Sequence, residues 1–166
     1  MPVKLVKSPN NFVLIATGIA LLLMALRAGM AAASHYPIPV DGVGGEAAAV
    51  ALSCTRDAIL GTALLFVALR KSRFAGATAV IAATLLLFGV ALRMFVFAVV
   101  ASAPMAFASF RVSWSVAIDL AIAGSLLAPL LFPWSGTANK RVFFWMAITF
   151  ASATLLIGSL AFLARQ

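Results

Sequence analysis

The 166-residue chain is 64% hydrophobic, only 10% charged, and carries a formal net charge of +8. Soluble domains are about half apolar and about a quarter charged, and a chain of this size has one modest core in which to hide apolar side chains. The composition therefore excludes a soluble globular protein and makes lipid the main solvent. The basic residues are spread over short polar segments, which is typical of membrane orientation signals and not of a nucleic-acid-binding face.

The scarcity of cysteine and histidine excludes several kinds of site. Cys54 and His35 are the only residues of their types in the sequence. An internal disulfide, a zinc or iron–sulfur cluster and bis-histidine haem ligation within this chain are therefore excluded. Neither a metal nor a cofactor is predicted.

Five apolar stretches are each long enough to cross about 30 Å of hydrocarbon as a helix, which takes about 20 residues. In chain order they cover residues 12–33, 47–69, 74–100, 112–132 and 142–164. The sequence therefore predicts an all-α, polytopic transmembrane bundle of about five spans, with residues 1–166 forming a single integral membrane domain. The composition of residues 101–111 leaves open whether they are helical or interfacial.

Lysine and arginine fall mostly on one side of this arrangement. If the N-terminus is cytoplasmic, seven basic residues lie on the inside: Lys4, Lys7, Arg70, Lys71, Arg73, Lys140 and Arg141. The opposite side keeps Arg111 and Arg165, together with the acids Asp41 and Glu46. The positive-inside rule thus predicts a cytoplasmic N-terminus, and we expect a multi-pass protein of a bacterial cytoplasmic (inner) membrane.

The first stretch has a second interpretation. Lys4 and Lys7, the apolar run 12–26 and the small residues 31–33 are similar to a cleaved secretory signal. Arg27 interrupts that pattern before the cleavage position, so we interpret residues 12–33 as an uncleaved first span.

Aromatic residues mark the expected membrane interfaces. Trp114 and Trp134 bracket the fourth stretch at positions about 30 Å apart on a helix, which suits an aromatic belt at each interface. Trp145 fits the inner belt of the fifth stretch. His35 and Tyr36 are expected to be interfacial loop residues.

Five ionisable residues fall inside the predicted spans: Arg27, Arg56, Asp57, Arg93 and Asp119. A charge at the bilayer centre costs roughly 3 kcal/mol or more, so such residues usually face the bundle interior or a water-filled cavity. Counting about 1.5 Å per residue from the polar segments places all five at or outward of the midplane. The inner half of every span is predicted to be free of charge.

Three arginines outnumber two aspartates in this set. Arg56 and Asp57 point about 100° apart on a helix and cannot face one partner together. We therefore expect pairs across helices, in which Asp57 or Asp119 meets Arg27, Arg56 or Arg93. Two interpretations stay open. In the first, the arginine without an aspartate partner forms an outward-facing pocket that binds an anionic head group. In the second, the ion pairs fix the register of the helices, and the remaining arginine extends its side chain to the membrane interface.

No catalytic constellation is evident. Two aspartates within the membrane suggest a proton-sharing protease dyad. The residues around Asp57 and Asp119, however, carry neither a Gly-x-Gly-Asp signature nor the Asn-containing context of lipoprotein signal peptidases. No serine has the Gly-x-Ser-x-Gly setting of an activated nucleophile. We predict no catalytic residue.

A short central pattern resembles a known group of membrane proteins. Arg56-Asp57-Ala58-Ile59-Leu60-Gly61 begins a span, the basic turn Arg70–Arg73 follows, and another apolar span comes next. This region, Ser53 to Arg93, resembles the central hairpin of small bacterial DoxX-like families and related uncharacterised four-helix membrane domains. The chain departs from them in its fifth span and around Arg93. Because those families mostly lack an assigned reaction, the resemblance implies a fold and no activity.

The sequence as a whole favours a non-catalytic membrane protein, either an accessory subunit of a larger assembly or a small lipid- or amphiphile-binding protein. Expected partners are membrane lipids, other membrane subunits or a second copy, with no nucleic acid. A transporter or channel component is the alternative, and an enzyme acting on a lipid is third. A continuous pore is disfavoured because Thr62 is the only polar residue between Asp57 and Arg70.

Overall fold

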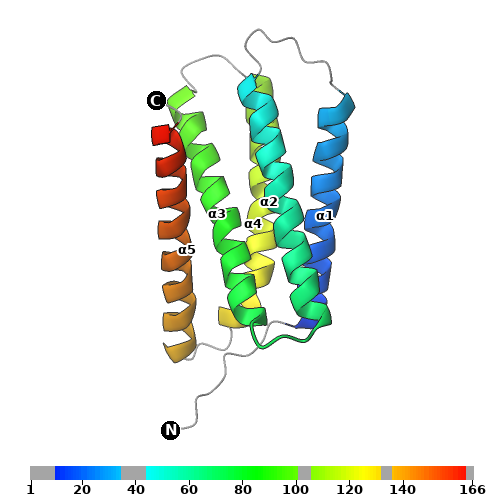
Figure 1. The fold of residues 1–166 in the computed structure, drawn as a ribbon, viewed down its shortest axis with the longest axis vertical. Coiled ribbons are helices and arrows are strands. Elements are labelled where there is room, and N and C mark those ends of the chain that lie inside the picture. Colours follow the sequence, from blue (N-terminus) through cyan, green and yellow to red (C-terminus); the bar gives the residue numbers. More distant parts are fainter. Residues whose placement is uncertain (1–9, 35–43, 101–105, 132–135, 164–166) are drawn as a thin grey trace. The chain divides into compact units, whose positions relative to one another are not determined.

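The structure, a computed structural model, describes residues 10–34, 44–100, 106–131 and 136–163. The regular elements in these ranges are five helices: α1 (Asn11–Ser34), α2 (Gly44–Leu69), α3 (Ala75–Val100), α4 (Ala106–Leu131) and α5 (Gly136–Leu163) (Figure 1). The all-α prediction is confirmed for the described residues. Each helix corresponds to one predicted apolar stretch, but α4 begins at Ala106 and α5 at Gly136, before their expected starts at residues 112 and 142. Continuous apolar runs form helices in lipid because a helix satisfies its own backbone hydrogen bonds.

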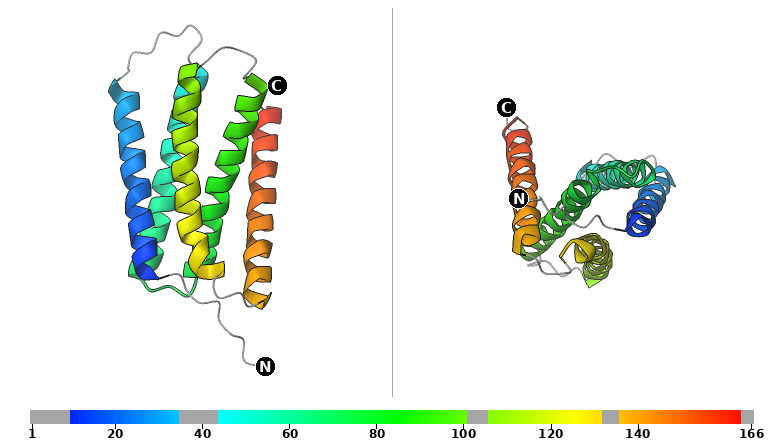
Figure 2. Two further views of the ribbon diagram at one scale, coloured as in Figure 1. Left: turned by 180° about the vertical axis from the view of Figure 1, so that it is seen from behind. Right: turned by 90° about the horizontal axis from the view of Figure 1, so that it is seen from below.

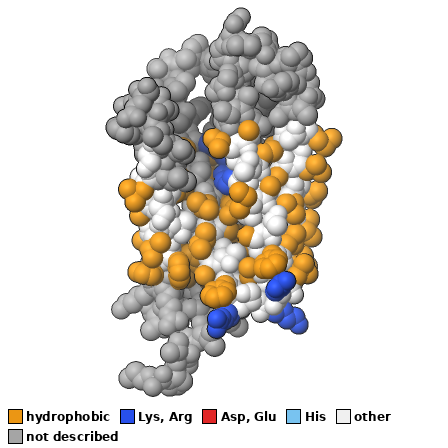
Figure 3. Space-filling view, in the orientation of Figure 1, with side chains coloured by type: hydrophobic (Ala, Val, Ile, Leu, Met, Phe, Trp, Pro, Cys, Tyr) orange, Lys and Arg blue, Asp and Glu red, His pale blue; other side chains and the backbone are white. Residues whose placement is uncertain are grey.

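Three helical segments are long and apolar enough to cross a membrane among the residues that the structure describes. They are Asn11–Met30, Ala51–Leu69 and Ala75–Phe95, and shorter apolar segments, Ser115–Leu131 and Phe144–Leu155, lie in α4 and α5. Many large apolar side chains on these helices are exposed, and Figure 3 shows hydrophobic side chains spread over the coloured middle part of the face in view. Such a surface is stable in lipid and not in water, so the structure indicates a membrane protein.

The chain forms two compact units, Asn10–Ala75 and Gly76–Gln166. In the first unit α1 and α2 lie side by side (Figure 2), and two glycines allow this contact. A Cβ added to Gly61 would lie 2.8 Å from the Gly18 carbonyl oxygen and 2.9 Å from Leu22 Cγ, and one added to Gly18 would lie 2.8 Å from Leu65 Cγ. The two backbones therefore approach more closely at Gly18 and Gly61 than any larger residue permits.

The same helix pair is joined further along by Cys54. Its thiol donates a hydrogen bond to the Ala25 carbonyl oxygen, with a sulfur–oxygen distance of 2.9 Å, and Gly29 lies beside the same sulfur. The α1 residues that face α2 are thus Gly18, Leu22, Ala25 and Gly29, which recur at alternating intervals of four and three. This spacing keeps one stripe of a helix against its neighbour. Cys54 is a packing residue of this interface.

The turn between α2 and α3 ends α2 with a two-bond cap. The Ser72 amide donates to the Val67 carbonyl and the Lys71 amide to the Ala68 carbonyl, the pattern of a Schellman motif. Lys71 takes the left-handed conformation that the motif requires, with φ 47°. Ser72 then caps α3, because its hydroxyl oxygen accepts a hydrogen bond from the Phe74 amide.

The left-handed backbone conformation of Lys71 predicts a difference in stability between two variants at this position. We expect Lys71→Gly to be more stable than Lys71→Ala by about 1 kcal/mol, because both lose the charge but only glycine is relieved of the Cβ clash. Thermal unfolding of the two purified variants in the same detergent measures this difference. Equal melting temperatures would show that the turn does not hold this conformation in solution.

The second unit contains α3, α4 and α5. Phe88 of α3 meets Phe150 of α5 edge to face, with ring centroids 5.2 Å apart. Near the start of α3, a Cβ added to Gly76 would lie 3.9 Å from Leu130 Cδ2 of α4, and α4 also contacts α5. These contacts hold α3 beside α4, so that Arg93 of α3 can reach α4.

Hydroxyl groups within the helices mostly bond to their own helix. The side chains of Thr17, Thr55, Thr84, Thr149 and Thr154 each donate to a carbonyl four residues earlier. This local bonding satisfies a hydroxyl in an apolar environment without any partner helix. The hydroxyl groups of these threonines are therefore used within their own helices, and the charged residues are the stronger candidates for a functional site.

Candidate functional site

The most buried charge in the second unit is Asp119 of α4, whose side chain is fully buried. Its Oδ2 lies 3.0 Å from a guanidinium nitrogen of Arg93 on α3. A second Arg93 nitrogen donates to the hydroxyl of Ser115 at 3.1 Å, and Ser115 lies one turn before Asp119 on the same face of α4. Arg93 is 26% exposed and thus reaches from the surface of this unit into its interior.

This group of three confirms one of the pairings expected from the sequence, a cross-helix pair of Asp119 with Arg93. Ser115 was missed by the sequence analysis. The spacing in the sequence could have indicated Ser115, because a serine four residues before a buried aspartate on a helix presents its hydroxyl beside the carboxylate. The arrangement satisfies two of the planar guanidinium's donors and neutralises its charge.

In the first unit an ion pair joins two neighbouring residues of α2. Asp57 is buried, and its Oδ1 accepts from Arg56, at 2.8 Å from Nε and 2.7 Å from the terminal nitrogen. Two neighbouring residues on a helix can do this because the long arginine side chain bends back over the backbone to the next position. Asp57 therefore has a guanidinium partner on its own helix, a pair that was not predicted from the sequence.

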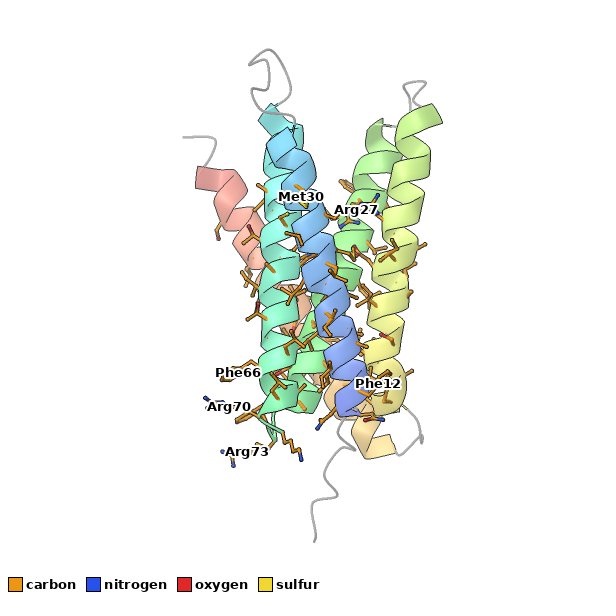
Figure 4. All side chains as sticks on the ribbon, turned by 90° about the vertical axis from the view of Figure 1, so that its right-hand side faces the viewer. Phe12, Arg27, Met30, Phe66, Arg70 and Arg73 are labelled. Carbon is orange, nitrogen blue, oxygen red and sulfur yellow. The ribbon has the colours of Figure 1, made fainter. Side chains whose placement is uncertain are left out.

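Arg27 of α1 is the arginine that these two pairs leave over. Its side chain is exposed, and it forms no ion pair with any of the described residues. It lies nine residues after Gly18, about two and a half helical turns, and so on the side of α1 opposite the α2 contact. Figure 4 shows Arg27 in the half of α1 away from Phe12, one turn before Met30.

The surroundings of Arg27 on α1 are apolar and exposed. Ile19, Leu23, Leu26 and Met30 are all exposed and, with a spacing of three or four residues, form one stripe along the helix. Leu23 and Arg27 are one turn apart, so the guanidinium borders this stripe. A cation beside an exposed apolar stripe is the arrangement that matches an amphiphile with an anionic head.

The two helices of the first unit place Arg27 and Arg56 at similar heights. The hydrogen bond between Cys54 and Ala25 sets the register, and each arginine lies two residues beyond it on its own antiparallel helix, so they are about 6 Å apart along the axis. Each also lies on the side of its helix away from the α1–α2 contact. Arg27 and Arg56 therefore share a level in the first unit and face different directions.

Most of the predicted interfacial residues lie outside the described residues. This is the case for His35, Tyr36 and Trp134, and for the side chain of Trp114. Trp145 is described: it is exposed on α5 and packs edge to face against Phe144, with centroids 6.2 Å apart. An exposed indole on an apolar helix suits a membrane interface.

The described residues contain no group of three or more metal-ligating side chains. What their charged groups can do chemically is bind an anion at Arg27 and, through the Arg93–Asp119 ion pair, hold the register between α3 and α4. No protein-family model, no curated protein and no solved structure matches the chain. The resemblance of Ser53 to Arg93 to DoxX-like families therefore stays a prediction.

Proposed function

We propose that this protein is a non-catalytic integral membrane protein that binds an anionic amphiphile through Arg27. The proposal includes the five spans, the cytoplasmic N-terminus and the bacterial inner membrane predicted from the sequence. One observation carries it: each buried aspartate forms an ion pair with an arginine, whereas the exposed Arg27, inside an apolar helical segment, forms no ion pair with any described residue. A guanidinium in lipid is costly without an anion, water or the interface.

The position of Arg27 supports a lipid-like ligand. It lies three residues before the end of the apolar segment Asn11–Met30, about 4.5 Å along the axis. A phosphate or carboxylate at the interface is within reach of its side chain, while an acyl chain would lie along Ile19, Leu23 and Leu26. The planar fork of donors binds such groups with two parallel hydrogen bonds.

The test compares what co-purifies with the protein. After extraction in mild detergent, native mass spectrometry should find an anionic adduct on wild type, and Arg27→Gln should reduce its occupancy about tenfold or more, the value of a charge-assisted hydrogen bond. Arg27→Lys keeps the charge without the fork and should retain part of the adduct.

Ile59→Gln is the matched control, because it changes an exposed apolar side chain of α2 and leaves every arginine in place. Its adduct should equal that of wild type. The proposal is wrong if Arg27→Gln and wild type carry the same adducts. If a protein is lost in place of a lipid, Arg27 binds a carboxylate of a partner, and the accessory-subunit form of the prediction is the correct one.

A further inference from the structure

A second group of cations lies at the other end of the first unit, in the turn between α2 and α3. We call it the basic turn and define it by these residues: Phe66, Leu69, Arg70, Lys71, Arg73 and Phe74. Figure 3 shows lysine and arginine gathered at this end of the molecule, and Figure 4 shows Phe66, Arg70 and Arg73 pointing outward together. We propose that the basic turn binds the phosphate head groups of anionic phospholipids.

Two guanidinium groups of the basic turn are held against aromatic rings. The central carbon of Arg70 lies 4.7 Å from the centroid of Phe66 and that of Arg73 lies 5.2 Å from the centroid of Phe74. Stacking on a ring uses the face of a guanidinium and leaves the donors at its edge available. Both arginines are thus partly preorganised to bind a phosphate with two hydrogen bonds.

The basic turn has no acidic neighbour to neutralise it. The sequence holds no aspartate or glutamate from residue 58 to residue 118, and Asp57, about 20 Å along α2 from Arg70, already accepts from Arg56. Arg70, Lys71 and Arg73 form no ion pair with any residue that the structure describes. No described residue therefore neutralises these three cations, which leaves them available to an external anion.

Exposed apolar groups among the cations indicate lipid as the source of those counter-ions. Phe66 is 56%, Leu69 74% and Phe74 58% exposed. A loop in water would not expose two phenyl rings and a leucine together, whereas the membrane interface accepts apolar groups beside charged ones. The apolar segments end at Leu69 and begin again at Ala75, which places the cations at the depth of lipid phosphates.

The inference needs only that the chain lies in a membrane, and it is independent of Arg27. In mixed micelles of equal phosphatidylglycerol and phosphatidylcholine, native mass spectrometry should show wild type retaining phosphatidylglycerol preferentially. The double variant Arg70→Gln/Arg73→Gln should lower that preference about 25-fold, since each cation near an anionic surface contributes about fivefold. Raising the salt concentration should lower the wild-type preference as well.

Two further variants test the rings and the folding. Phe66→Leu/Phe74→Leu keeps all three cations and should lower the preference about two- to fivefold through loss of the stacking. Arg70→Lys/Arg73→Lys keeps the charge and should retain an intermediate preference. These two decide the question if the double glutamine variant does not fold, because a preference equal to that of wild type in both would overturn the proposal.

The controls separate this site from others. Ile59→Gln changes an exposed apolar side chain of α2 and leaves every arginine in place, so it should leave the preference for phosphatidylglycerol unchanged. The loss caused by Arg70→Gln/Arg73→Gln should be the same whether or not Arg27→Gln is also present, because the basic turn does not include Arg27. An unchanged preference in a folded Arg70→Gln/Arg73→Gln variant would overturn the proposal. Displacement of phosphatidylglycerol by inorganic phosphate, beyond that caused by chloride at equal ionic strength, would also overturn it and assign the turn to a small soluble anion.

Discussion

Asp119→Leu should destabilise the protein by about 3 kcal/mol or more, the largest effect expected for a single substitution in this chain. The fully buried carboxylate is the ion-pair partner of Arg93 at 3.0 Å. Removing it leaves a mostly buried guanidinium with the Ser115 hydroxyl in place of an anion, and breaking a buried pair from one side costs about 3–5 kcal/mol. Unfolding in mixed micelles of increasing dodecyl sulfate content measures the loss.

The double variant Arg93→Leu/Asp119→Leu separates the stability cost of an unpaired charge from that of altered packing. Replacing both partners by apolar residues removes the uncompensated charge, so its stability should return to within about 1 kcal/mol of wild type. Asp119→Asn keeps an acceptor oxygen and should have an intermediate stability. If Asp119→Leu proved as stable as the double variant, the pair would contribute nothing to the fold of the second unit.

Gly61→Ala should cost about 2 kcal/mol, the second largest effect. The added methyl group would lie 2.8 Å from the Gly18 carbonyl oxygen and 3.2 Å from the Leu22 amide nitrogen. Both are backbone atoms, which cannot turn aside as a side chain can, so α1 and α2 must move apart and lose contacts along their length. The same unfolding measurement reports the loss.

Gly124→Ala is the matched control, because no atom lies within 4 Å of a methyl group added there. Alanine favours a helix over glycine by up to about 1 kcal/mol, so this variant should be as stable as wild type or slightly more stable. A Gly61→Ala protein equal in stability to Gly124→Ala would contradict the close approach of α1 and α2.

The sequence predicts the helices well because each is a long apolar run, and lipid leaves such a run no other way to satisfy its backbone. It does not select the ion pairs. Arg93 and Asp119 were one of several possible cross-helix pairs, and the choice depends on the relative register of α3 and α4, which no local pattern encodes. For Arg56 and Asp57, helical geometry predicts the directions of the two Cβ atoms. It does not predict that the long arginine side chain folds back to reach the neighbouring carboxylate.

The glycine contact shows the same limit. Gly61 belongs to a group of small residues with helix-contact spacing that is visible in the sequence. Its partner Gly18 stands in an ordinary apolar run, and nothing around it distinguishes it from the neighbouring alanines. The partner becomes apparent only when α1 and α2 are placed side by side.

In a membrane that carries an electrical potential, the basic turn would couple the chain to the electric field. Its three cations have no acidic residue near them in sequence, and moving one elementary charge through 100 mV changes the free energy by about 2.3 kcal/mol. Carrying all three across such a potential, negative on the side of the turn, would cost about 7 kcal/mol. In a membrane with that potential, the field would help to keep the basic turn on the side on which it was inserted, and dissipating the potential would remove that contribution at once.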